Sequence, residues 1–304
     1  MQRQMAVPAR HRFFGLDSDE RYDRNGDLAA RMERCLRPEI EQRFGLSAEV
    51  LADAVERELT RRFATGAFVD LATIGIDVAG KRVLDLGSGM GSAALEAALR
   101  GGCPIAIEPG RGLREVACDR LREVGQGLVM AADGESLPLR DDSIDVAVSL
   151  QVLEHVANPQ AMLQEVFRVL RPGGVFLLTC ENYLSFREGH YRVAWLPLLP
   201  KPIGAAYLRL RGRSPEFLYN SVTYVTRPGV IRMLRKCGFS LVRKEQIDAF
   251  ARDPSRIPTG WKRWLATRLG RVLSAETLSS LAFASQELRS LCASLVYEIV
   301  RKPA

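Results

Sequence analysis

A glycine-rich turn after a short apolar strand is the feature that most constrains what this chain can fold into. The strand is expected at Arg82–Leu86, and the turn at residues 87–91 reads Gly-Ser-Gly-Met-Gly before a helix that begins near Ser92. Glycine lacks a Cβ atom, so the backbone can turn sharply there and approach a ligand closely. A GxGxxG dinucleotide turn would need glycine at position 92. The pattern therefore predicts a ligand-binding strand–turn–helix unit that differs from a dinucleotide site.

From Lys81 onward, short apolar segments alternate with helical ones. Asn158 and Pro159 favour the start of one helix, because Asn caps a helix N-terminus and Pro suits the first helical position. Such alternation predicts an α/β fold with a mainly parallel, doubly wound sheet. Strands are expected at 82–86, 104–107, 127–131, 144–149, 175–179, 239–246 and 294–300.

The chain is expected to divide into an N-terminal helical segment and one larger domain. Residues 1–79 would form a helical lid or brace, in which Ser47 caps a helix that runs to about Phe63. Residues 80–304 would form the main domain. The alternation stops twice, which predicts insertions at about 183–228 and 249–293. The first insertion follows the fifth strand directly, so we expect it to cap the sheet edge where ligands bind.

Acidic residues lie at or just past the ends of the first three strands. Asp85 lies two residues before the first glycine of the turn, where it can orient the loop and attract the positive end of an amino-acid ligand. Glu108 follows the second strand and suits the two hydroxyls of a ribose. Asp133 and Gly134 follow the third strand, where a carboxylate and an N–H can bind adenine. Together these residues predict a ligand with an amino-acid part, a ribose and an adenine.

Four further motifs accompany the glycine-rich turn: ADGESLP at 132–138, SIDV at 143–146, VLEHV at 152–156 and LRPGG at 170–174. With the turn, they resemble the motifs of class I methyltransferases of the ubiquinone and menaquinone methylase type. The resemblance is strongest over residues 81–182. The helix and strand expected between 226 and 246 extend it to about half of the chain.

The resemblance implies a Rossmann-like sheet of seven strands, the last of them antiparallel. It also implies S-adenosylmethionine as the cofactor and S-adenosylhomocysteine as the product. The residues implied to bind the cofactor are Asp85, Gly87, Ser88, Gly89, Glu108, Asp133 and Gly134, with Ser149, Leu150 and Gln151 beside the reactive methyl group.

Cysteine and histidine are too few and too scattered along the chain to predict a metal site. The six cysteines show no CxxC or Cys/His ligand spacing, and we expect free thiols in a reducing compartment. Only three histidines are present. No apolar run could cross a bilayer, and the first residues lack the apolar centre of a signal peptide. We therefore expect a cytoplasmic protein without a metal.

The net charge of +7 raises the question of a nucleic-acid partner. No recognisable RNA-binding module accompanies the charge. Residues 149–152 read Ser-Leu-Gln-Val, where enzymes that methylate exocyclic base amines carry Asp/Asn-Pro-Pro-Tyr/Phe. Nucleic acid is therefore not the expected partner. A basic amphipathic helix expected from Trp261 leaves peripheral contact with a membrane open, although packing on the domain is the more frequent role of such a stripe.

The leading hypothesis for the acceptor is a small, or lipid- or sugar-linked, molecule that is methylated on oxygen. His190 lies just past the fifth strand and would serve as general base, since a neutral imidazole with a pKa of about 6.5 suits proton removal. His155 is expected mainly to support the active-site loop, and His11 lies in the N-terminal tail. The alternatives are C-methylation of a quinone-like ring and a binding protein that keeps the fold without catalysis.

Overall fold

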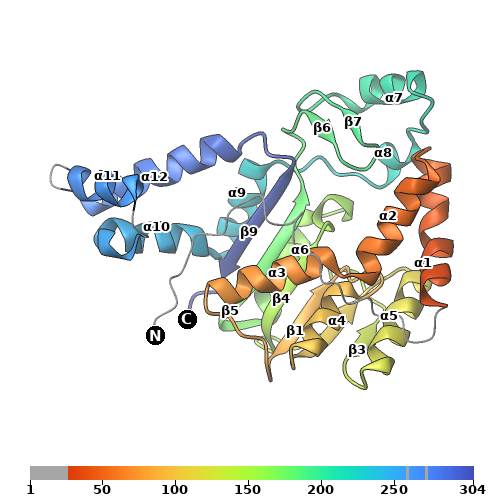
Figure 1. Ribbon diagram of the computed structural model, residues 1–304, viewed down its shortest axis with the longest axis horizontal. Coiled ribbons are helices and arrows are strands. Elements are labelled where there is room, and N and C mark those ends of the chain that lie inside the picture. The colour runs from red at the N-terminus through yellow and green to blue at the C-terminus, as the bar shows by residue number, and fades with distance from the viewer. Residues whose placement is uncertain (1–26, 258–259, 271–272) are drawn as a thin grey trace.

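The computed structural model describes residues 27–304 except 258–259 and 271–272, so His11 lies outside the described residues. A seven-stranded sheet runs through its centre, with helices on both faces (Figure 1). Its strands are β1 (Arg82–Leu86), β2 (Cys103–Ile107), β3 (Leu128–Met130), β4 (Ile144–Leu150), β5 (Leu170–Glu181), β8 (Ser240–Leu241) and β9 (Leu295–Arg301).

The strand order is β3-β2-β1-β4-β5-β9-β8. Strands β1 to β5 are parallel to one another, whereas β9 runs antiparallel to both β5 and β8. Six of the seven residues of β4 are buried, as expected for a parallel strand that is covered on both faces. The predicted doubly wound sheet of seven strands with one antiparallel strand is confirmed.

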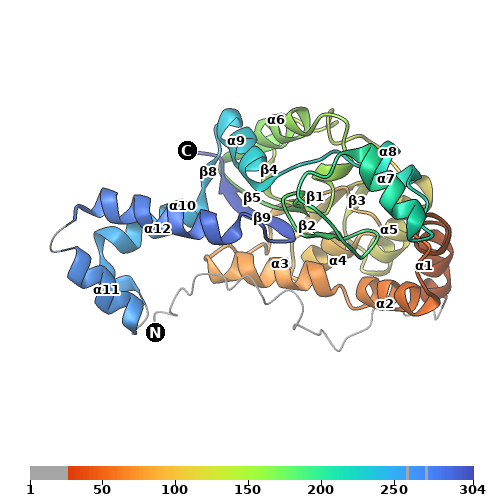
Figure 2. The ribbon, with the colours of Figure 1, turned by 90° about the horizontal axis from the view of Figure 1, so that it is seen from above.

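Figure 2 shows the helices in two layers, one on each side of the sheet. Alternate residues of β5 point to opposite faces of the sheet. Val175 and Leu177 pack in one hydrophobic cluster, and Phe176 and Leu178 pack in the other. One layer holds α3 (Arg62–Thr73), α4 (Ser92–Leu99) and α5 (Arg111–Glu123). The other holds α6 (Pro159–Val169) and α9 (Arg227–Cys237).

The N-terminal helices pack beside the glycine-rich turn. They comprise α1 (Leu28–Arg37), a π-helical segment (Pro38–Arg43) and α2 (Ala48–Leu59). Met32 and Leu51 share a buried cluster with Met90 of the turn. The single helix expected from Ser47 to about Phe63 is interrupted, because Arg61 adopts a left-handed conformation (φ 52°) between α2 and α3. This conformation accompanies a buried hydrogen bond from Arg61 Nε to Glu96 Oε2 at 3.1 Å.

The prediction of a strand at 239–246 is wrong for most of its length. Only Ser240 and Leu241 pair with β9, and α10 (Val242–Arg252) begins at the next residue. The sequence after Val242 is mainly charged, and Lys244 forms an (i, i+4) ion pair with Asp248 that supports a helix. A short edge strand gains too few backbone hydrogen bonds to outweigh this local preference.

Two additions project from the core in different directions (Figure 1). The cap comprises β6 (Arg187–Glu188), β7 (Val193–Ala194), α7 (Lys201–Leu210) and α8 (Glu216–Asn220), and it lies beyond the end of β5. The arm comprises α10, a short 3-10 turn (Pro254–Arg256), α11 (Trp261–Leu269) and α12 (Ala275–Ser290). Across the described part of the chain, we find no helix long and apolar enough to span a bilayer.

Candidate cofactor and acceptor site

The predicted site residues gather at the carboxyl ends of the parallel strands. Strands β2 and β3 extend the sheet from one edge of β1, whereas β4 pairs with the other edge of β1. The order in which strands are added therefore changes direction between β1 and β4. Ligands of open α/β sheets bind at such a switch point. Asp85, Glu108, Asp133 and Gln151 all lie at or just past strand ends on this edge.

The glycine-rich turn is held against the neighbouring strand. The N–H groups of Gly87 and Ser88 both donate to the carbonyl oxygen of Ile107, each at 2.9 Å. Gly87 has φ +68°, and a Cβ atom there would lie 2.4 Å from Val152 Cγ2. Gly89 has φ +53°, but an added Cβ atom would meet open space. The turn therefore packs tightly at Gly87 and leaves room for a ligand beside Gly89.

We expect Gly87→Ala to destabilise the fold more than Gly75→Ala does. Gly75 also has positive φ (+80°), but an added Cβ atom there meets nothing within 4 Å. The left-handed conformation costs each alanine about 1–2 kcal/mol. Only Gly87→Ala adds the clash with Val152, and overpacking of this kind costs about 1–3 kcal/mol more. Chemical denaturation of both variants measures the difference, and equal losses of unfolding free energy would contradict the packing assigned to Gly87.

Glu108 ties the turn to the segment after β2. Its Oε2 accepts the N–H of Gly89 at 2.9 Å, and its Oε1 accepts the N–H of Gly110 at 2.7 Å. Burial raises the pKa of this carboxyl, and the two N–H donors oppose the rise. Each carboxylate oxygen has a second lone pair, so Glu108 can still accept two ribose hydroxyls. Asp133 is exposed just past β3, and Gly134 lies against Met162.

Asp85 lies beneath the turn at the start of α4. It is buried, and its Oδ2 accepts the N–H of Ala94 at 2.8 Å, in the first turn of the helix. Burial raises the pKa of Asp85 to about 7, and the charge of Glu108 adds to the rise. A cationic group near this carboxyl would favour its ionised form.

We expect the cofactor to bind more tightly as pH rises through 7. Below pH 7 the raised pKa leaves Asp85 largely protonated, so its proton must leave before the carboxylate can attract the cofactor's ammonium group. Calorimetry should show about a tenfold gain in affinity between pH 6 and pH 8. One pH unit below the pKa, only about a tenth of the Asp85 carboxyls are ionised, and one unit above it nearly all are. Asp85→Asn removes this dependence while the cofactor's own titration is unchanged. Parallel pH profiles for both proteins would contradict the assignment.

The residues predicted beside the methyl group lie at the end of β4 and directly after it. Ser149 is fully buried, whereas Leu150 and Gln151 are half-buried. Gln151 has φ +62°, and its N–H donates to the carbonyl oxygen of Thr179 at 3.0 Å. The chain thus leaves the sheet at Gln151 in a sharp turn. A short 3-10 helix, Leu153–His155, follows directly.

His190 lies where the cap meets this 3-10 helix. Its Nδ1 donates to Glu188 Oε1 at 2.9 Å, and its Nε2 lies 3.3 Å from Nε2 of His155. Burial opposes protonation of His190, but the hydrogen bond to Glu188 and the charges of Glu188, Glu181 and Glu154 outweigh it and raise the pKa to about 9. The ordinary pKa of about 6.5 assumed from the sequence is therefore wrong for this environment. The structure holds His190 as a hydrogen-bond donor.

Sequence reasoning missed three of the residues around this histidine. Glu154 and Glu188 are buried, and burial raises the pKa of Glu181 to about 8. The run Glu188-Gly189-His190 was the only local signal, because the other carboxylates lie 9 and 36 positions away in the chain. Tyr191, the next residue in the chain, is fully buried in the core of the cap, where its hydroxyl donates to the carbonyl oxygen of Ser214 at 2.7 Å.

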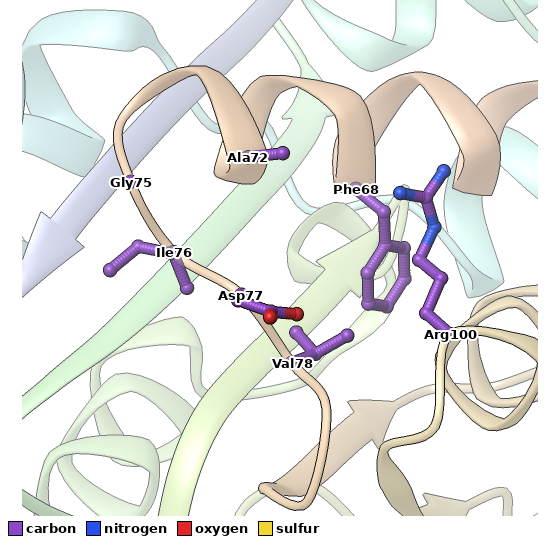
Figure 3. Close-up of a pocket in the computed structure, with 7 residues that line it drawn as sticks. All are labelled: Phe68, Ala72, Gly75, Ile76, Asp77, Val78 and Arg100. Atoms are coloured by element: carbon purple, nitrogen blue, oxygen red, sulfur yellow. The ribbon is translucent and has the colours of Figure 1, made fainter. Parts of the chain in front are cut away.

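A cavity of about 430 Å³ lies elsewhere, at the amino ends of the strands (Figure 3). Phe68 of α3, the loop that precedes β1 and Arg100 after α4 line it. Ligands of this sheet architecture bind at the opposite, carboxyl edge. None of the predicted site residues lines this cavity. The sheet order, glycine turn and strand-end acids instead define an α/β domain that binds an adenosine-containing cofactor.

Comparison with known proteins shows what the central part of this domain is similar to. Residues 84–178 match the model of the methyltransferase domain. Uncharacterized methyltransferases from Mycobacterium ulcerans and Mycobacterium marinum are each 38% identical to this chain over 151 residues, which are 50% of this chain and 59% of each relative. The chain thus spans less than two thirds of the length of these relatives. Over residues 84–178 it matches the methyltransferase domain, and the site geometry fits S-adenosylmethionine as the cofactor of that domain.

Solved structures agree on the fold. A provisionally named sarcosine dimethylglycine methyltransferase from Galdieria sulphuraria is 17% identical, with a TM-score of 0.51, and the match covers 81% of this chain and 88% of that chain. A provisionally named S-adenosylmethionine-dependent methyltransferase from Listeria monocytogenes is 18% identical, with a TM-score of 0.50 over 79% of this chain and 100% of that chain. At these identities the likeness concerns the fold alone.

Proposed function

We propose that the protein transfers the methyl group of S-adenosylmethionine to an oxygen of a small, or lipid- or sugar-linked, acceptor. The observation that carries the proposal is the paired His155 and His190, which join the cap to the 3-10 helix that follows β4. The cofactor site and the cap meet at this edge, so an acceptor beneath the cap would face the cofactor's methyl group. The sulfonium is already activated, and alignment of the acceptor is the main task left to the protein.

His190 is the residue that we assign to the acceptor hydroxyl. Its Nδ1 is fixed by Glu188, which directs Nε2 away from the cap and toward His155. A fixed imidazole of this kind can donate a hydrogen bond to an oxygen or, once deprotonated, take its proton. A carbon acceptor, as in a quinone-like ring, would need no such group. The histidine pair thus favours oxygen over carbon, and the complete turn with Asp85 and Glu108 favours catalysis over a binding role alone.

The test is a methyl-transfer assay with radiolabelled S-adenosylmethionine and fractionated cell extracts. Label should appear in a product that is stable to mild base if it is an O-methyl ether, and mass spectrometry then locates the methyl group. Label on ring carbon would support the quinone alternative. Cofactor binding without any transfer across all fractions would support a non-catalytic protein.

The arm supports a further proposal, contact with an anionic membrane that carries a lipid-linked acceptor. On α11, Trp264 is 61% exposed, and Leu265 and Leu269 are also exposed. Arg268 lies over the Trp264 ring at 5.4 Å. Arg271 and Val272, which belong to the basic amphipathic helix expected from the sequence, lie outside the described residues. Sedimentation with vesicles, which should fall for Trp264→Ser, tests this contact.

A further inference from the structure

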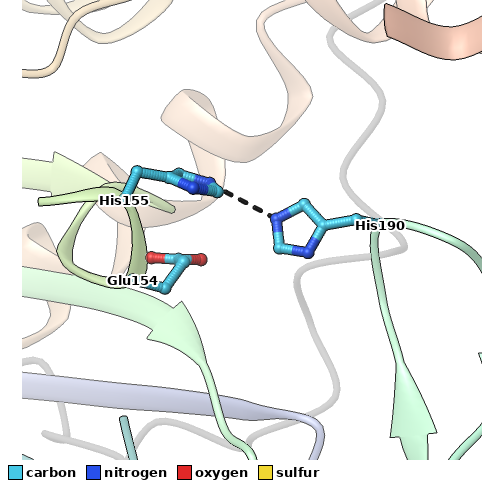
Figure 4. Close-up of side chains that lie close together, drawn as sticks. All are labelled: Glu154, His155 and His190. Carbon is cyan, nitrogen blue, oxygen red and sulfur yellow. Dashed lines mark hydrogen bonds between the residues drawn. The ribbon is translucent and has the colours of Figure 1, made fainter. Parts of the chain in front are cut away.

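Two histidines and a glutamate face one another at the base of the cap (Figure 4). One potential ligand atom each from Glu154, His155 and His190 lies within 4.8 Å of the other two. His155 is exposed, so the cluster is open to solvent, whereas Glu154 is fully buried. We propose that these three side chains bind one divalent transition-metal cation of the zinc type.

The tautomers of both histidines suit a metal. Nδ1 of His155 donates to the carbonyl oxygen of Ser221 at 2.7 Å, and Nδ1 of His190 donates to the Glu188 carboxylate at 2.9 Å. Neither acceptor carries a hydrogen, so both Nδ1 atoms must hold theirs. Metal-binding histidines almost always make this outer hydrogen bond to a carbonyl or carboxylate. The Nε2 atoms are then the ones that can present lone pairs, and they face each other.

The spacing of the two Nε2 atoms matches a shared ion. They lie 3.3 Å apart. Two imidazole nitrogens bound to tetrahedral zinc at about 2.0–2.1 Å are separated by about 3.3 Å. Without a metal, two such nitrogens can meet only through a proton on one of them. A cation that binds both would displace that proton to solvent.

The carboxylate provides a second, independent observation. Oε1 of Glu154 accepts the N–H of Glu181 at 3.0 Å, but Oε2 has no hydrogen-bond partner among the described residues, although it is buried. A buried carboxylate oxygen left unpaired is costly, and a cation offsets that cost. The Glu188 carboxylate, hydrogen-bonded to His190, adds negative charge beside the pair. Two histidines and one glutamate also leave a coordination position open, as in catalytic zinc sites.

This proposal replaces the expectation of no metal, which considered spacing along the chain alone. His155 and His190 are 35 positions apart, and only the docking of the cap brings them together. Binding of the ion does not depend on methyl transfer. If the proposed function also holds, the open position lies on the acceptor side, where the ion would bind and orient an acceptor oxygen.

The experiment measures metal rather than activity. The purified full chain is stripped with a chelator, loaded with Zn²⁺ and passed through gel filtration, and the retained metal is counted. We expect one equivalent, lost in His155→Ala, in His190→Ala and in Glu154→Gln. His11→Ala, the remaining histidine, is the control and should retain it. Glu188→Gln keeps the shape of the outer partner and should weaken binding by about 10- to 100-fold.

Cobalt substitution and cofactor binding complete the test. Co²⁺ bound by nitrogen and oxygen gives visible d–d bands without thiolate charge transfer, so a thiolate band would assign the metal to a cysteine and overturn the proposal. No retained equivalent in the parent protein, or an unchanged one in His190→Ala, would also overturn it. Calorimetry with S-adenosylhomocysteine on the same samples separates the two proposals, because cofactor binding should survive loss of the metal. Metal binding without cofactor binding would leave the site in place and refute the methyltransferase function.

Discussion

Glu108→Ala should weaken S-adenosylmethionine binding by about 5- to 150-fold. That range corresponds to about 1–3 kcal/mol, the cost of leaving hydrogen-bonded groups of a ligand unpaired. The side chain both accepts the N–H of Gly89 and faces the region assigned to the ribose, so its removal also loosens the turn. Isothermal calorimetry with S-adenosylhomocysteine measures the change.

Glu115→Ala is the matched control for Glu108. Glu115 is an exposed acid on α5, and its ion-pair partner among the described residues is Arg111 at the surface, at 2.9 Å. Its removal changes the net charge by the same amount without touching the turn. Equal affinities for the parent, Glu108→Ala and Glu115→Ala would contradict the cofactor site. A loss shared by both variants would assign the effect to overall charge.

His190→Ala should reduce turnover by about 100- to 10,000-fold, the contribution typical of a positioned acid or base. Cofactor affinity should not change, because His190 lies on the cap and not in the turn. Arg187→Ala is the control, since Arg187 is exposed on the same hairpin. Steady-state kinetics on the identified acceptor give the result, and a rate within a few-fold of the parent would refute the role.

Glu188→Gln distinguishes the ways in which His190 can act. If the imidazole acts directly on the acceptor, the loss of its carboxylate partner should change the pH profile of turnover. If the imidazole holds a metal, chelation of the parent enzyme should reproduce the loss seen in His190→Ala. A chelator-resistant parent with a defective His190→Ala variant would assign the residue to the acceptor alone.

The fold was predictable because its signals are local. The apolar runs of β1, β2, β4 and β5 are long enough to identify parallel strands. The carboxyl ends of parallel strands share one edge, so the positions of Asp85 and Glu108 follow from the strand assignment. The β8–α10 boundary was not predictable, since two paired residues decide it against a charged sequence that favours a helix.

The acceptor side could not be predicted, because tertiary contacts create it. Nothing in the sequence indicates that Val152 closes against Gly87, or that the cap brings His190 to His155. The protonation state of His190 depends on carboxylates from three separate positions. The ordinary pKa of a histidine does not apply to His190, because the surrounding carboxylates raise its pKa to about 9. Such clusters become visible only when the packing is known.

The position of β9 has a consequence for how the chain is made. β9 follows every other strand in the sequence, yet it lies between β5 and β8. Leu295 is synthesised 114 positions after Glu181, which takes a ribosome about 6 to 23 s at about 5–20 residues per second. Throughout that interval one edge of β5 has no partner strand, and its apolar segment can pair with another chain. The nascent protein is thus prone to aggregate during this interval, when a chaperone that shields β5 would raise the yield of folded protein.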